Sequence, residues 1–191
     1  MAGLFSCKEK KQQSAPAPAT TPDTTHATYL PVADFIRSDI NLVDSFAGGI
    51  LQKNVINNRK DSNYITPPDF HRFAENFLVP ELDSARFKNN YTEESLMDET
   101  TEMLNFIYTA KSPDLSLRKV VVYLNPSLTT DKVSRIYMEK ESIQGDTLVQ
   151  QKLVWKIKES CYRLTIRQAK QGAAITSIEK IIWDPQHFAT D

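Results

Sequence analysis

Glycine and cysteine are scarce in this chain, and long apolar runs are missing. There are five Gly in 191 residues, and Gly48-Gly49 has no strand pattern before it, so no glycine-rich phosphate loop is expected. A G-x-S-x-G motif is also missing. No run of about 18 apolar residues occurs, which argues against a membrane-spanning helix. The two cysteines, Cys7 and Cys161, are too few for a disulfide framework.

Neither the histidines nor the net charge of the chain indicates a ligand. The three His residues are scattered and have no neighbours at metal-ligand spacing, so we expect neither a metal nor a cofactor. The net charge of −1 gives no field that would attract nucleic acid. It conceals an asymmetry, however: residues 29–117 hold 8 Lys and Arg against 14 Asp and Glu, whereas residues 118–180 hold 12 against 6. We interpret this as mutual complementation within one fold, in preference to a charged partner surface.

The segment 8–28 contains no large apolar residue, but it holds three Pro and five Thr. Such a segment has nothing to bury that would offset its ordering entropy, so we expect residues 1–28 to form a disordered tail or tether. Residues 29–191 are then a single domain, which is long enough for one core.

The tail begins with Leu4-Phe5-Ser6-Cys7, which resembles the lipobox of bacterial lipoproteins. The resemblance implies that Cys7 becomes the lipidated first residue of a membrane-anchored cell-envelope protein, with the polar segment as its spacer. Met1-Ala2-Gly3 supplies neither a basic nor an apolar leader, so a lipoprotein start would be trimmed or misplaced in this sequence. The alternative is an incidental thiol at the end of a frayed arm on a cytoplasmic protein.

Residues 29–98 are predicted to be mainly helical. Apolar residues recur at helical spacing over 30–51. A second helix begins at Thr66, where Pro67-Pro68-Asp69 completes a capping pattern. The aromatic residues at Phe70, Phe73 and Phe77 then form a core-facing stripe, and Pro80 ends this helix. Residues 54–63 read as a loop, and 81–98 is ambiguous.

Residues 99–184 are predicted to form an antiparallel sheet. Alternating apolar residues and turn signals favour strands at 100–110, 118–125, 132–142, 147–158, 160–169 and 174–184. Short loops join antiparallel neighbours. The expected fold is therefore α+β, with N-terminal helices packed on one face of a curved antiparallel meander of about five or six strands.

A two-residue turn at Gly145-Asp146 would place Ile136 opposite Trp155 and Met138 opposite Leu153. A second turn at Glu159-Ser160 would then place Leu164 opposite Trp155 and keep the large apolar side chains on one face. The same register puts five cations on the opposite face, beside Cys161. These candidate anion-binding residues are Arg135, Lys152, Lys156, Arg163 and Arg167. Their ligand would be an anion such as a lipid headgroup, an acidic glycan or an acidic protein; the alternative, which we favour, is a solvated outer face.

No catalytic residue is assigned. We expect a noncatalytic binding or interaction module, anchored to the envelope by lipid on Cys7. The alternative is a small enzyme or ligand-sequestering domain with a cavity between helices and sheet, where Tyr64, Tyr91, Tyr108 and Tyr162 would supply polar groups.

Overall fold

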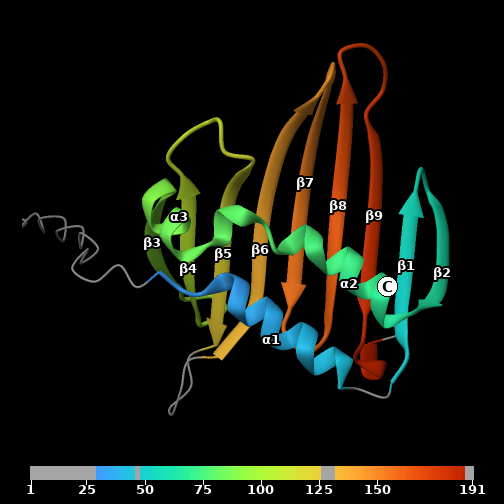
Figure 1. Cartoon of the computed structure of the whole chain (residues 1–191), viewed down its shortest axis with the longest axis horizontal. Coiled ribbons are helices and arrows are strands. Elements are labelled where there is room, and N and C mark those ends of the chain that lie inside the picture. The colour runs from blue at the N-terminus through green and yellow to red at the C-terminus, as the bar shows by residue number, and fades with distance from the viewer. Residues whose placement is uncertain (1–28, 46–47, 126–131, 188–191) are drawn as a thin grey trace, which may run out of the picture.

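The computed structural model describes residues 29–45, 48–125 and 132–187, and its centre is one nine-stranded antiparallel sheet (Figure 1). The strands are β1 (Ile50–Ile56), β2 (Arg59–Ile65), β3 (Tyr91–Asp98), β4 (Met103–Ala110), β5 (Leu117–Asn125), β6 (Lys132–Gln144), β7 (Thr147–Lys156), β8 (Ser160–Ala169) and β9 (Ile175–Ile182). The α-helices are α1 (Val32–Asp44), α2 (Pro67–Ala74) and α3 (Ser84–Asn90). Three 3-10 turns cover Glu75–Phe77, Pro80–Leu82 and Pro185–His187.

The strand order is β2-β1-β9-β8-β7-β6-β5-β4-β3. The strands from β3 to β9 therefore form one meander, in which each strand pairs with the next along the chain. The hairpin of β1 and β2 is added beside β9, with Leu51 opposite Ile182. With this hairpin the sheet has nine strands, whereas five or six were predicted from the sequence.

The predicted fold class was wrong, because the sheet has nine strands and three of them lie in the segment expected to be mainly helical. Both sheet edges come from this segment, and β2 is exposed along almost its whole length. An edge strand with solvent on both faces needs no apolar alternation, so the period of two is lost. A turn signal was nevertheless present, since Asn57 and Asn58 both adopt positive φ values of 47° and 66° between β1 and β2.

Helices α1 and α2 run across the strands on one face of the sheet, which we call the helix face (Figure 1). The start of α2 is as predicted: Thr66 is the N-cap, and its side chain accepts a hydrogen bond from the Asp69 N–H. Phe70, Phe73 and Phe77 are buried, as their spacing predicts. By contrast, α1 ends at Asp44, well before the predicted end of that helix.

The core between helices and sheet contains two aromatic groups. Phe70, Phe77 and Trp183 pack around Trp155, with ring centroids 5.1–6.2 Å from those of the Trp155 side chain. Farther along the sheet, Tyr29, Phe87, Tyr91 and Tyr108 form the second group. Burial in these groups removes apolar surface from water and orients α2 and α3 on the sheet, since Phe70 belongs to α2 and Phe87 to α3.

The predicted pairing of β6 with β7 is confirmed, because Ile136 lies opposite Trp155 and Met138 opposite Leu153. The predicted pairing of β7 with β8 is wrong. Trp155 lies opposite Cys161 instead of Leu164, because three residues (157–159) separate the strands. Since the shift is by an odd number of residues, it turns every side chain of β8 to the other face.

Candidate functional site

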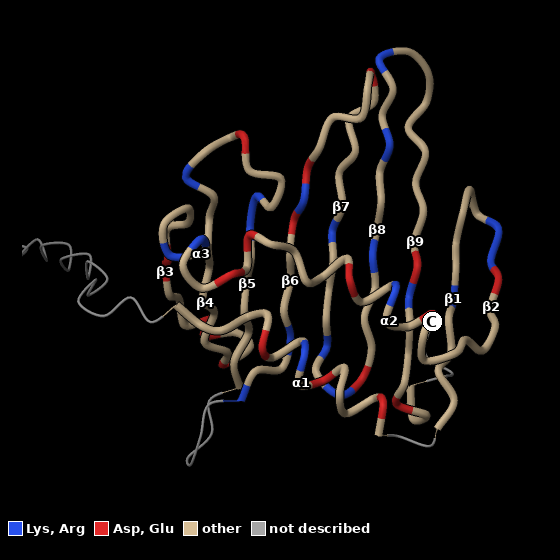
Figure 2. The backbone as a smooth tube through the Cα atoms, viewed as in Figure 1, with Lys and Arg blue, Asp and Glu red and all other residues tan. Residues whose placement is uncertain are grey.

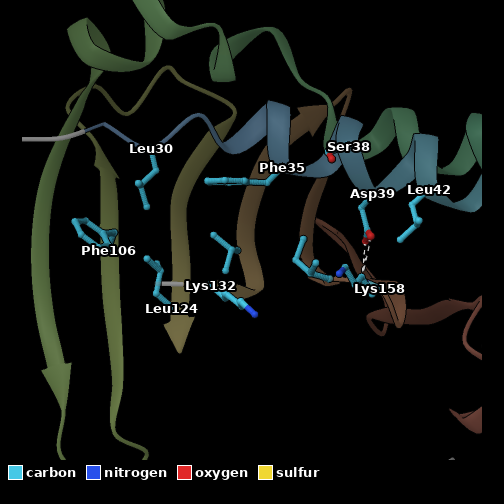
Figure 3. A pocket seen from close by; sticks show the side chains of 11 residues that line it. Leu30, Phe35, Ser38, Asp39, Leu42, Phe106, Leu124, Lys132 and Lys158 are labelled. Carbon is cyan, nitrogen blue, oxygen red and sulfur yellow. Dashed lines mark hydrogen bonds between the residues drawn. The ribbon is translucent and has the colours of Figure 1, made fainter. Parts of the chain in front are cut away.

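A groove of about 1010 Å³ lies between α1 and the adjoining ends of β4, β5 and β6, next to the loop between β7 and β8 (Figure 3). Seven apolar side chains line it. They are Leu30, Phe35, Leu42, Phe106, Leu124, Val133 and Ile157. The groove exists because α1 turns Ile36 and Ile40 into the core and presents Phe35 and Leu42 on the neighbouring side of the helix. This composition suits the hydrocarbon part of a small molecule.

Asp39 is the acidic residue that lines the groove, and the protein itself already engages its carboxylate. The Trp155 Nε1–H donates to Oδ2 over 2.7 Å, and the Lys158 N–H donates to both carboxylate oxygens over 2.9 and 3.1 Å. Burial raises the pKa of Asp39, although these hydrogen bonds act in the opposite direction. Asp39 therefore has a structural role, because its hydrogen bonds join α1 to the loop between β7 and β8.

Two lysines add positive charge to the groove. Lys132 begins β6, and Lys158 belongs to the loop between β7 and β8 (Figure 3). Lys158 has a φ of 63°, in the left-handed region, and its backbone N–H is held there by Asp39. The groove therefore combines apolar walls with two cations, an arrangement complementary to an amphipathic anion.

The candidate anion-binding residues lie on both faces of the sheet. Arg135 and Lys156 are direct cross-strand neighbours on the face opposite the helices, which we call the far face, and Lys152 shares that face opposite Glu139. The Arg135 guanidinium stacks 4.1 Å from the Tyr123 ring centroid, and the Lys156 ammonium lies 2.9 Å from a Glu159 carboxylate oxygen. Anion binding by this group remains a prediction.

Arg163 and Arg167 lie on the helix face, because of the three-residue loop between β7 and β8. The Arg163 guanidinium pairs with the Glu179 carboxylate, donates to Asn76 Oδ1 and lies 5.2 Å from the Phe73 ring centroid. Arg167 donates to Gln144 Oε1 over 3.2 Å. The structure thus separates these two residues from Arg135, Lys152 and Lys156.

Cys161 also moves to the helix face, where it is fully buried. Burial raises the pKa of its thiol, the reverse of the shift expected beside an arginine. Cys7, the candidate lipidation site, lies outside the described residues.

Sequence reasoning missed Lys53, Lys60 and Lys180. They lie on the far face of β1, β2 and β9, around a hollow of about 570 Å³. The Asn57-Asn58 turn is the signal that could have revealed the first two, since a hairpin there puts Lys53 and Lys60 on one face.

Of the tyrosines proposed as polar groups in a cavity, Tyr91 and Tyr108 are fully buried. The Tyr91 hydroxyl donates to the Leu117 carbonyl, and the Tyr108 hydroxyl accepts from the Leu30 N–H. Tyr64 is 68% exposed at the edge strand. These three side chains therefore do not line the groove.

Within the ranges that the structure describes, no three His, Cys, Asp or Glu side chains gather as metal ligands. No helix in those ranges is both long and apolar enough to cross a membrane. Comparison with known proteins adds no relative, because no protein-family model matches the chain and no curated protein matches its sequence.

Proposed function

We propose that the folded domain is a noncatalytic binding module that takes an amphipathic anion with a hydrocarbon chain into the groove beside α1. The observation that carries the proposal is the lining of the groove, which combines seven apolar side chains with Lys132 and Lys158. Apolar walls favour the chain of such a ligand, and the ammonium groups favour its anionic end. The carboxylate of Asp39 is engaged by Trp155 and Lys158, which supports a binding role rather than a reaction.

We also propose that lipid on Cys7 anchors the protein at a bacterial cell envelope, facing the periplasm or the exterior. The support is the lipobox-like Leu4-Phe5-Ser6-Cys7 and the polar segment that follows it. A domain so placed would hold its ligand close to the membrane.

A fluorescent long-chain fatty acid tests the groove directly. The purified protein is expected to bind it saturably, and Leu42→Glu is expected to weaken binding roughly tenfold, because it puts a charge on an apolar wall. Leu42 is already 44% exposed, so folding should survive the change. The matched control is Ile143→Glu at the exposed tip of β6, remote from the groove.

The anionic end is tested with two ligands of equal chain length, the fatty acid and its methyl ester. The double variant Lys132→Gln/Lys158→Gln should bind the acid more weakly and the ester unchanged. Equal loss for both ligands would contradict a charge-reading role for the lysines. No saturable binding of either ligand, or an equal effect of Ile143→Glu and Leu42→Glu, would refute the groove as the binding site.

A further inference from the structure

Lysines accumulate on the far face of one half of the sheet. The strands β2, β1, β9, β8 and β7 are consecutive there, and cross-strand pairing places their far-face residues in rows. One row contains Ser62, Lys53, Lys180, Tyr162 and Val154. The next contains Lys60, Val55, Ile178, Leu164 and Lys152, and Lys156 belongs to a third.

Lysine dominates this half of the far face, although two carboxylates border it: Glu159, which follows β7, lies 2.9 Å from the Lys156 ammonium, and Asp61 on β2 lines the hollow at the β2 end. It carries five lysines, while none of its positions within these five strands, all of which the structure describes, is occupied by Asp or Glu. Figure 2 shows Lys and Arg positions in blue on β2, β1, β9 and β7, with acidic positions in red on β2 and β9. On the same face, Glu139 on β6 lies directly opposite Lys152, and Glu94 lies farther along on β3, so the run of positive charge ends at β6. We call the five-strand half, with Lys53, Lys60, Lys152, Lys156 and Lys180, the lysine face.

The lysine face is also hollowed. The space of about 570 Å³ at its β2 end is lined by Lys53, Lys60 and Lys180, together with Asn54, Val55, Asp61, Ser62 and Ile178. Three ammonium groups outnumber the single carboxylate, that of Asp61, around this hollow. The excess of positive charge suits a phosphate headgroup, which carries negative charge and accepts several hydrogen bonds. This observation is independent of the groove beside α1.

We propose that the lysine face docks on the surface of an anionic phospholipid bilayer. Five adjacent strands extend over about 20 Å, so the charge is spread over an area and complements a surface better than a single extended peptide. Tyr64, 68% exposed, and Ile178, 38% exposed, add an aromatic and an aliphatic side chain at the level where headgroups meet hydrocarbon. The proposal depends neither on the groove ligand nor on lipid at Cys7.

The test uses the full chain with Cys7→Ser, so that acylation cannot contribute to binding. The protein is sedimented with vesicles of phosphatidylglycerol and phosphatidylcholine in equal parts, or of phosphatidylcholine alone. Binding is expected only to the anionic vesicles, and it should decline steeply as salt rises from about 20 mM to about 200 mM. The variant Lys60→Gln/Lys152→Gln, which changes two exposed side chains, should reduce partitioning about twenty-five-fold, or about fivefold for each lysine.

The control variant is Arg37→Gln/Lys88→Gln, which removes the same charge from exposed residues of α1 and α3. It should retain binding within about twofold, because those helices are not on the lysine face. Equal loss in both double variants would mean that net charge alone drives binding, and would overturn the proposal. Failure to bind anionic vesicles at low salt would also overturn it, and selective binding of poly-glutamate instead would assign the lysine face to an acidic protein.

Discussion

Asp39 shows how much of this structure depends on one buried carboxylate. It is 4% exposed, and it accepts hydrogen bonds from the Trp155 indole and from the Lys158 backbone. These two donors come from β7 and from the loop that follows it, whereas Asp39 comes from α1. In the sequence, Asp39 is one acid among many in a helical segment, and its partners lie more than a hundred residues away.

Replacing Asp39 with Ala should lower the free energy of unfolding by about 3 kcal/mol, because it leaves the buried Trp155 indole N–H and the part-buried Lys158 N–H without an acceptor. Denaturant unfolding monitored by tryptophan fluorescence measures this change. Asp34→Ala is the matched control, since the Asp34 side chain on the same helix is 69% exposed. A loss of less than about 1 kcal/mol for Asp39→Ala, or an equal loss for both variants, would contradict the bridging role.

The ionisation of Asp39 should also make the free energy of unfolding depend on pH. Because burial raises the pKa of Asp39, the folded protein retains this proton at pH values where the unfolded chain, with a pKa near 3.8, has lost it. This group's contribution to the free energy of unfolding is thus fully present below about pH 3.8 and is lost as pH rises through the folded pKa. The difference in stability between the wild-type protein and Asp39→Asn should therefore fall as pH rises from about 4 to about 7, and a rising or constant difference would be incompatible with this assignment.

At the scale of the elements, two successive hairpins show which strand registers can be predicted from the sequence and which cannot. Gly145 is the first residue of the tight turn between β6 and β7, with a φ of 61°, so the local sequence was sufficient to predict that register. The next turn depends on Lys158, a residue with no particular preference for positive φ, whose N–H bonds Asp39 on a distant helix. Because that contact is tertiary, local patterning could not reveal the face of Arg163 or Cys161, and two of the five candidate anion-binding residues were misplaced.

Changing Gly145 to Ala should destabilise the protein by about 1–2 kcal/mol through the backbone alone, since a Cβ at this position meets nothing within 4 Å. The reciprocal change is Asn58→Gly in the hairpin of β1 and β2, where φ is 66°. It should be neutral or stabilising by a few tenths of a kcal/mol, because Asn-Gly favours this turn. Thermal unfolding of both variants tests the pair; an unaffected midpoint for Gly145→Ala would show that the turn relaxes without strain.

At the scale of the whole molecule, the positive surface does not follow the charge asymmetry between the two halves of the sequence. The hairpin of β1 and β2 comes from the acidic half of the chain, yet it places Lys53 and Lys60 beside Lys180 from the basic half. The positive surface is thus assembled from both ends of the sequence, and a composition count by halves could not locate it. The groove was equally hidden, because its lining comes from five separate stretches of the chain.

The proposed anchor is a property of the whole native protein. Intact mass measured on protein purified from its source cells, with membrane fractionation alongside, should show a mature chain that starts at Cys7 and carries several acyl groups. Protein recovered in the membrane fraction with that mass would support the envelope assignment. Soluble protein with an unmodified Cys7 would refute it. The groove and the lysine face would then have to be tested as sites on a cytoplasmic protein.

The pairing of β1 with β9 has a consequence for how the chain is made. During synthesis β1 and β2 emerge early, but the strand that β1 needs beside it is the last one of the sheet. The first hairpin must therefore wait through the synthesis of the six intervening strands, with the β1 edge that faces β9 unpaired. Contacts so distant in sequence form slowly, because the intervening loop must be closed before any pairing energy is gained. We therefore expect the nascent chain to remain incompletely folded until β9 has been made, with an interval in which a chaperone could bind the open edge of β1.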